Sequence, residues 1–86
     1  MITIELFGVP RLRAGRPLVR LEAVDVGSAL RALGLFCPEL EGSVITDGRI
    51  QPSYKLSLNG DRFITEPETP LAEGDVLLLL AADVGG

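Results

Sequence analysis

The apolar run at residues 76–80 (VLLLL) constrains the fold more than any other segment of this chain. It follows Gly74 and Asp75 and is too short to form a stable helix in water by itself. Unbroken apolar residues over the length of a strand are typical of a strand that is buried on both faces. We therefore expect residues 76–80 to form the central strand of a sheet.

Other segments alternate apolar and polar residues, as half-buried strands do, and they cover residues 2–7, 18–21 and 54–58. The connection over residues 8–17 is short and rich in Gly and Pro, which predicts an antiparallel hairpin from the first two strands. Asn59 and Gly60 predict a turn into a short strand at residues 62–64. The sequence therefore predicts two hairpins.

One helix is expected between these hairpins. Asp25 can cap a helix that begins at Val26, because an apolar stripe recurs there with helical spacing through Leu33. Gly34 and Pro38 mark its end. Residues 39–53 are irregular, and a turn at Asp47 and Gly48 predicts a loop or a small extra hairpin.

This order of elements predicts an α+β fold, with a mixed sheet of about five strands packed on one helix. The first and last strands pair in parallel and the hairpins flank them. That arrangement is the β-grasp, or ubiquitin-like, architecture. We expect residues 1–82 to form this domain and residues 83–86 to form a flexible C-terminal tail that ends in Gly-Gly.

The composition argues against several classes of partner. The net charge is -4, the pI is about 4.6 and the arginines are dispersed, so the chain lacks the basic surface of a nucleic-acid-binding protein. No apolar run is long enough to cross a membrane, and no signal peptide precedes the first strand. The single cysteine, Cys37, fits a reducing compartment and is expected to be a buried thiol. We expect a cytoplasmic protein.

The residues offer little for catalysis. The chain has no histidine, which is the commonest general base and metal ligand. The nearest carboxylate pairs, Glu66 with Glu68 and Glu73 with Asp75, lie in expected turns, where solvated charges are usual. No phosphate-binding loop or metal-ligand spacing is present. The sequence therefore predicts neither an enzyme nor a resident metal or cofactor.

Gly85 and Gly86 end the sequence and are the strongest functional signal. Without a Cβ atom, a glycine carboxylate can enter a narrow active site and be activated there as an acyl-adenylate. We therefore predict that Gly86 is the reactive residue, and that Asp83, Val84 and Gly85 form the tail that presents it.

A family resemblance rests on Leu6 and Phe7 at the end of the first strand, on residues 59–61 and 69–75, and on the terminal Gly-Gly. Together these resemble the MoaD/ThiS family of ubiquitin-like sulfur carriers, most nearly the branch of the molybdopterin synthase small subunit. Some relatives that share its long segment between the helix and the third strand supply sulfur to other pathways, so the branch stays open. The chain also departs from the molybdopterin branch at residues 81–84 (AADV), where proline and small apolar residues are usual, and the charge of Asp83 leaves the adenylating enzyme and the acceptor open.

The resemblance implies a sulfur carrier that is at most the non-catalytic small subunit of a synthase. A ubiquitin-activating-type adenylyltransferase would use ATP to adenylate Gly86, and a sulfur donor would displace AMP to leave a thiocarboxylate. The sulfur would then pass to a synthase subunit, such as the molybdopterin synthase large subunit, with cysteine, thiamine or secondary-metabolite pathways as other acceptors.

The phase of the first strand places Phe7 opposite its apolar stripe, so Phe7 is either a core aromatic or part of an exposed patch that docks partners. Leu78 or Leu80 on a neighbouring strand would enlarge that patch.

Two other functions need no sulfur. One is a protein modifier conjugated through Gly86, whose polymeric chains could grow only from Lys55, the lone lysine, or from the amino terminus. The other is a non-reactive β-grasp interaction module.

Overall fold

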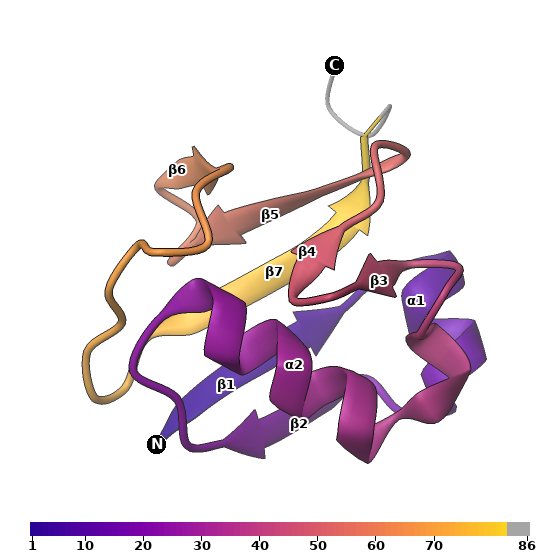
Figure 1. The fold of residues 1–86 in the computed structure, drawn as a ribbon, viewed down its shortest axis with the longest axis horizontal. Helices are drawn as coiled ribbons and strands as arrows, with labels where there is room; N and C mark the ends of the chain where they lie inside the picture. Colours follow the sequence, from indigo (N-terminus) through magenta and orange to yellow (C-terminus); the bar gives the residue numbers. More distant parts are fainter. Residues whose placement is uncertain (83–86) are drawn as a thin grey trace.

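The computed structural model describes residues 1–82 as a five-stranded sheet with a helix across one face (Figure 1). The strands lie in the order β2-β1-β7-β5-β6, and β3 and β4 form a separate hairpin. The elements in chain order are β1 (Ile2–Leu6), α1 (Val9–Ala14), β2 (Leu18–Leu21), α2 (Val26–Phe36), the 3₁₀ turn η1 (Pro38–Leu40), β3 (Ile45–Thr46), β4 (Arg49–Ile50), β5 (Tyr54–Leu58), β6 (Arg62–Ile64) and β7 (Val76–Ala81).

The first and last strands form the parallel centre of this sheet. Ile4 of β1 lies opposite Leu77 of β7, and each strand has an antiparallel partner on its other side, β2 for β1 and β5 for β7. The predicted α+β β-grasp fold, with its mixed sheet on one main helix, is confirmed.

The burial of β7 corrects one expectation. Leu77 and Leu79 are fully buried, but Leu78 and Leu80 on the opposite face are only partly covered. β7 is central, as predicted, yet it is buried on one face and not on both. The reason is that α2 and the β3–β4 hairpin cover a single face of the sheet (Figure 1).

The connection between β1 and β2 contains the short helix α1, which the sequence analysis does not predict. Pro10 lies in its first turn, where a missing N–H breaks no helical hydrogen bond, and its side chain is buried. Gly15 ends the helix in the left-handed conformation, with φ 73°, and donates its N–H to the Arg11 carbonyl at 2.9 Å. Gly and Pro here mark the two ends of a short helix. The same residues also occur in loops, so their presence in the sequence does not distinguish the two.

The predicted start of α2 is confirmed. The Asp25 carboxylate accepts the Ser28 N–H at 2.8 Å, and the Asp25 N–H donates to the Ser28 hydroxyl at 3.3 Å. The helix continues past Gly34 to Phe36, and Cys37 follows it as a buried residue. Burial also raises the pKa of the Cys37 thiol, as expected of a core cysteine.

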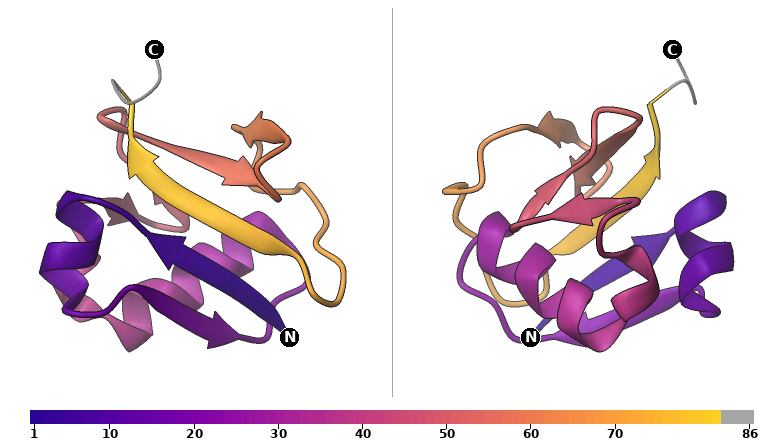
Figure 2. Two further views of the ribbon diagram at one scale, coloured as in Figure 1. Left: turned by 180° about the vertical axis from the view of Figure 1, so that it is seen from behind. Right: turned by 45° about the vertical axis from the view of Figure 1, so that its right-hand side comes forward.

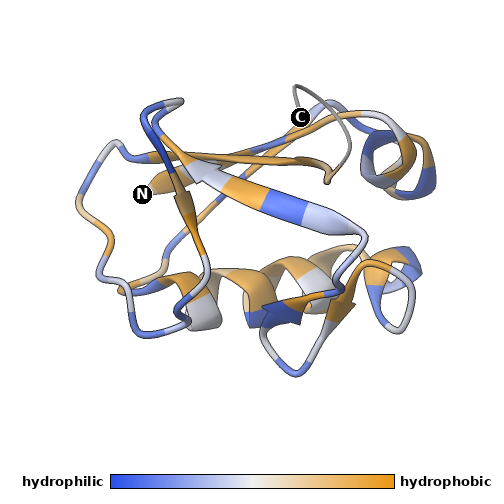
Figure 3. Cartoon of the chain, turned by 90° about the horizontal axis from the view of Figure 1, so that it is seen from above, coloured by the Kyte–Doolittle hydropathy of each residue, from blue (hydrophilic) through white to orange (hydrophobic). Residues whose placement is uncertain are grey.

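The core lies between the sheet and α2 (Figure 3). β1 and β7 contribute Ile2, Ile4, Leu6, Leu77 and Leu79, and α2 contributes Val26, Ala29, Leu30 and Leu33. The small hairpin expected around Asp47 and Gly48 is present as β3 and β4, and it adds Ile45 to the core. Hydrophobic side chains of both layers thus meet in one cluster.

Two residues, Asn59 and Asp75, fasten the start of β7. Asn59 takes a positive φ of 56° in the β5–β6 turn, and its amide donates to Asp75 at 3.1 Å and accepts the Val76 N–H at 2.8 Å. The second carboxylate oxygen of Asp75 accepts the Ala72 N–H at 2.8 Å. The hydrogen bonds that Asp75 accepts lower its pKa, chiefly the one from the Ala72 N–H and then the one from Asn59.

Truncating alternate leucines of β7 should have unequal effects on stability. We expect Leu79→Ala to lower the free energy of unfolding by about 2 to 5 kcal/mol, because it leaves a cavity in the core. Leu78→Ala removes a partly exposed side chain and should cost clearly less. Urea denaturation of both variants measures the difference, and equal losses would contradict the one-sided burial of β7.

Stability should fall in acid partly through Asp75. Its pKa is lowered by folding, so its contribution is present above the ordinary value of 3.8 and is lost as the pH falls below it. In thermal unfolding between about pH 5 and about pH 3, Asp75→Asn should lose less Tm than the wild type. Asp61→Asn, whose carboxylate makes no such contacts among the described residues, is the control and should follow the wild type.

Candidate functional site

The face of the sheet that α2 leaves open is the candidate site. Seen from behind, no helix within residues 1–82 crosses β1, β7 and β5 there (Figure 2). The strand registers place Glu5 beside Leu78, and Leu80 beside Lys55, on this face. An uncovered sheet face with leucines on its central strand is available for contact with another molecule.

Three predicted docking residues meet at one end of this face. Phe7, Leu78 and Leu80, together with Gly8 and Ala81, line an apolar hollow of about 290 Å³. Phe7 is 41% exposed and the leucines are partly covered, whereas the preceding Leu6 is fully buried. Phe7 is therefore not a core aromatic, and the structure brings it against Leu78 and Leu80.

Phe63 and Lys55 extend the open face across β5 and β6, and the sequence analysis does not predict this pair. Phe63 is 59% exposed, and the Lys55 Nζ lies 4.4 Å from the centre of its ring. A two-residue turn at Asn59 and Gly60 would pair Leu58 with Asp61 and turn Phe63 toward the core. In the structure Asp61 is an extra residue, Leu58 pairs with Arg62, and Phe63 lies opposite Ser57 on the open face.

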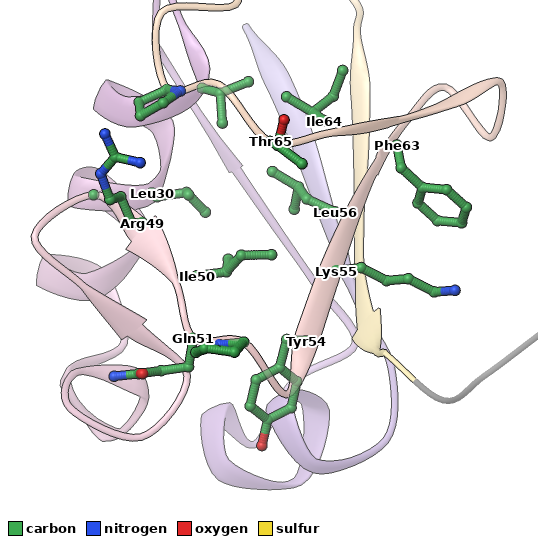
Figure 4. A pocket seen from close by; sticks show the side chains of 14 residues that line it. Leu30, Arg49, Ile50, Gln51, Tyr54, Lys55, Leu56, Phe63, Ile64 and Thr65 are labelled. Carbon is green, nitrogen blue, oxygen red and sulfur yellow. The ribbon is translucent and has the colours of Figure 1, made fainter. Parts of the chain in front are cut away.

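A larger hollow of about 420 Å³ lies on the other side of β5, where the β3–β4 hairpin diverges from the main sheet (Figure 4). Its centre is apolar, with Leu30, Ile50 and Leu56 around it, while Lys55 and Phe63 point away to the open face (Figure 4). It contains no pair of carboxylates and lies away from the predicted site residues. We regard it as a packing gap between β4 and β5.

Of the two carboxylate pairs named from the sequence, Glu73 and Asp75 have structural contacts. Glu73 forms an ion pair with the Met1 ammonium, and Asp75 accepts hydrogen bonds at the start of β7. Over residues 1–82, no cluster of acidic, cysteine or histidine side chains is arranged to hold a metal ion. In the same range, no helix is long and apolar enough to cross a membrane.

β7 delivers the chain toward the predicted reactive end. Its last residue, Ala81, pairs with Tyr54, and the N–H of Ala82 donates to the Ser53 carbonyl at 2.8 Å. The predicted tail residues, Asp83, Val84, Gly85 and Gly86, lie outside the described residues. The hollow at Phe7 and Leu80 is thus beside the point from which they continue.

Comparison with solved structures identifies relatives of this chain. Small archaeal modifier protein 1 of Haloferax volcanii is 30% identical, with a TM-score of 0.83 over 99% of this chain and 98% of that one. A chain in the complex of subunits 1 and 2 of the molybdopterin-converting factor from Helicobacter pylori is 27% identical, with a TM-score of 0.65 over 99% and 97%.

A chain of the BexX/CysO complex from Amycolatopsis orientalis shares the fold, with a TM-score of 0.81 over 100% of both chains at 17% identity. No protein-family model and no curated protein gives a significant match. These relatives belong to a family of small β-grasp carriers, which are generally non-catalytic, and two of them were solved in complex with a partner. Given its β-grasp topology and 30% identity over nearly its whole length to the Haloferax protein, the chain belongs to the MoaD/ThiS-like family of small carrier proteins that includes the archaeal modifiers.

Proposed function

We propose that this protein is a sulfur carrier whose Gly86 carboxylate is adenylated and then converted to a thiocarboxylate. An adenylyltransferase of the ubiquitin-activating type supplies the active site and uses ATP. We infer that this reaction takes place in the cytoplasm. A sulfur donor displaces AMP from Gly86. The thiocarboxylate then donates its sulfur in cofactor biosynthesis, with molybdopterin as the favoured product.

The observation that carries this proposal is the Gly85-Gly86 sequence shortly after the last strand of a MoaD/ThiS-like domain. In adenylation, a carboxylate oxygen of Gly86 attacks the α-phosphate of ATP and pyrophosphate leaves. Sulfide then attacks the carbonyl carbon of Gly86 and AMP leaves, and the missing Cβ of glycine leaves that carbon unhindered. The domain itself needs no catalytic group, because the activating enzyme and the acceptor subunit provide the chemistry. Its role is to be held while Asp83, Val84 and Gly85 extend into the partner's site.

We further propose that the apolar hollow formed by Phe7, Leu78 and Leu80 is the docking surface. It combines an exposed aromatic with leucines of the strand that leads to the tail. Buried aromatic anchors commonly carry much of the affinity of an interface. The Helicobacter relative, solved as a complex of two molybdopterin-converting factor subunits, supports an acceptor subunit as one partner.

A protein modifier conjugated through Gly86 is the second candidate. The name of the Haloferax relative, small archaeal modifier protein 1, favours it. Both functions begin with the same adenylate, and they differ in the nucleophile that accepts Gly86. Mass spectrometry of cell extracts separates them: Gly86 linked to lysines of other proteins indicates a modifier, and a thiocarboxylate at Gly86 indicates a sulfur carrier.

Sulfur loading can be tested directly. With an activating enzyme of this family, ATP and sulfide, we expect the intact mass to rise by the difference between sulfur and oxygen. A folded protein whose mass stays unchanged with every family activating enzyme would refute sulfur carriage.

Deleting Gly86 should abolish this mass change and leave the domain folded, because residues near a chain end that make few packing contacts contribute little to stability. Thermal unfolding of the deletion variant should match that of the wild type. A large loss of Tm would mean that the tail is a structural element.

Docking through Phe7 is tested by Phe7→Ala. We expect weaker binding to the activating enzyme by about 1 to 3 kcal/mol, as for an interface aromatic, with little loss of stability. Leu35→Ala is the matched control, because Leu35 is an apolar residue of α2 that is 86% exposed and lies in the other layer. Calorimetric titration measures both variants; unchanged affinity in a stable Phe7→Ala protein would exclude this docking surface.

A further inference from the structure

The outer edge of β2 carries backbone groups that make no hydrogen bond within residues 1–82. β2 is the last strand on its side of the sheet (Figure 1). The Leu6 N–H of β1 donates to the Pro17 carbonyl at 2.8 Å. Backbone groups alternate in direction along a strand, so Val19 also faces β1, and Leu18 and Arg20 face away from it. Their N–H and C=O groups are therefore free to pair with another strand.

The strand at the opposite edge of the sheet is less suited to such pairing. β6 has three residues, and the Asp61 N–H just before it donates to the Leu58 carbonyl of β5. The same alternation then leaves only Phe63 of β6 facing outward. Native proteins often shorten an edge strand because a free edge pairs with strands of other molecules. β2 has four residues and offers the longer free edge.

We propose that β2 pairs with β2 of a second copy of this chain, antiparallel and about a two-fold axis at Val19. Leu18 of each copy then lies opposite Arg20 of the other, and the two residues exchange N–H···O=C hydrogen bonds. The sheet becomes continuous through both copies. This interaction is separate from the proposed sulfur-carrier chemistry and does not depend on it.

Charge favours this register over its neighbours. Arg16 precedes β2, Glu22 follows it, and both are exposed. With the axis at Val19, Arg16 of each copy lies near Glu22 of the other. An axis at Leu18 would instead put Arg16 beside Arg20, and an axis at Arg20 would put two Arg20 side chains together. Like charges directly opposite one another destabilise a strand pair.

The helix layer has a surface that fits the same two-fold axis. Ser28, Ala32 and Phe36 recur with helical spacing and share one stripe of α2. This stripe faces the β2 side, because the Arg16 guanidinium lies 4.7 Å from the centre of the Phe36 ring. Ser28 and Ala32 are small and partly exposed, and Phe36 is 57% exposed. The stripes of two copies can therefore approach closely and add apolar contact beside the paired strands.

Edge pairing extends the sheet sideways and does not cover its open face. We therefore expect the hollow formed by Phe7, Leu78 and Leu80 to stay open in the dimer. Dimerisation and docking of a partner are then compatible.

Hydrogen exchange of the wild-type protein tests the pairing. The edge is short, so we expect a weak dimer with a dissociation constant of about 0.1 mM. Between about 10 μM and about 1 mM protein, exchange of the Leu18 and Arg20 amides, measured by NMR, should slow about fourfold. The Phe63 amide faces outward at the other edge and should keep its rate. Unchanged Leu18 and Arg20 rates, or equal slowing of Phe63, would overturn the proposal.

A charge exchange tests the register. Arg16→Glu and Glu22→Arg each place like charges together twice in the dimer, so each should weaken it about tenfold in sedimentation equilibrium. The double variant restores opposite charges and should return to within about threefold of the wild type. Arg62→Glu makes the same charge change on exposed β6 and should leave the dimer unaltered. Absence of rescue, or equal loss with Arg62→Glu, would contradict this register.

Oxidation of single-cysteine variants tests the axis. In a Cys37→Ala background, Val19→Cys places two thiols across the axis with Cα atoms about 4.5 Å apart, within the range of a disulfide. Leu18→Cys places them about 8 Å apart, beyond that range. We expect at least about tenfold more linked dimer from Val19→Cys, with circular dichroism verifying that both variants are folded. Equal linking, preferential linking of Leu18→Cys, or a wild-type protein that is monomeric at about 1 mM would overturn the proposal and leave sulfur carriage standing.

Discussion

The parallel pairing of β1 with β7 is the constraint on which the rest of the structure depends. It brings the first and last strands together at the centre of the sheet, with Ile4 opposite Leu77. β2 then pairs with the other edge of β1, and β5 pairs with the other edge of β7. Parallel strands require a long crossover connection, and α2 lies within it. That crossover covers one face of the sheet and leaves the other exposed.

The same pairing places the amino terminus and the end of β7 at opposite ends of the sheet. Met1 is fixed at the start of β7 by the Gly74 hydrogen bond, whereas Ala82 leaves the sheet at the opposite end. Phe7 follows β1 and therefore lies beside Leu80, at the end where β7 finishes. An apolar surface next to the last described residues would allow a partner to hold the domain and receive the tail at once, as the proposed carrier function requires.

The ionisable groups with resolved pKa shifts serve the fold. Asp25 caps α2 and Asp75 fastens the β5–β6 turn to β7; in both, hydrogen bonds to backbone N–H groups lower the pKa. The pKa of Cys37 is raised by burial, as for a core residue. None of these shifts comes from a desolvated pair of carboxylates, which is the arrangement expected of an acid–base site.

The sequence by itself determined the β-grasp order, the cap at Asp25, the central place of β7 and the diglycine that directs the functional proposal. These follow from local pattern and periodicity, which act within a few residues. Only the tertiary structure decided which leucines of β7 are exposed, since that depends on α2 covering a single face. The helix at Val9–Ala14 and the position of Phe63 also needed the structure. A buried Pro10 stabilises the helix, and one extra residue, Asp61, sets the register that turns Phe63 to the open face. Gly, Pro and Asn in the sequence do not predict either result, because packing and strand register depend on segments far apart in the chain.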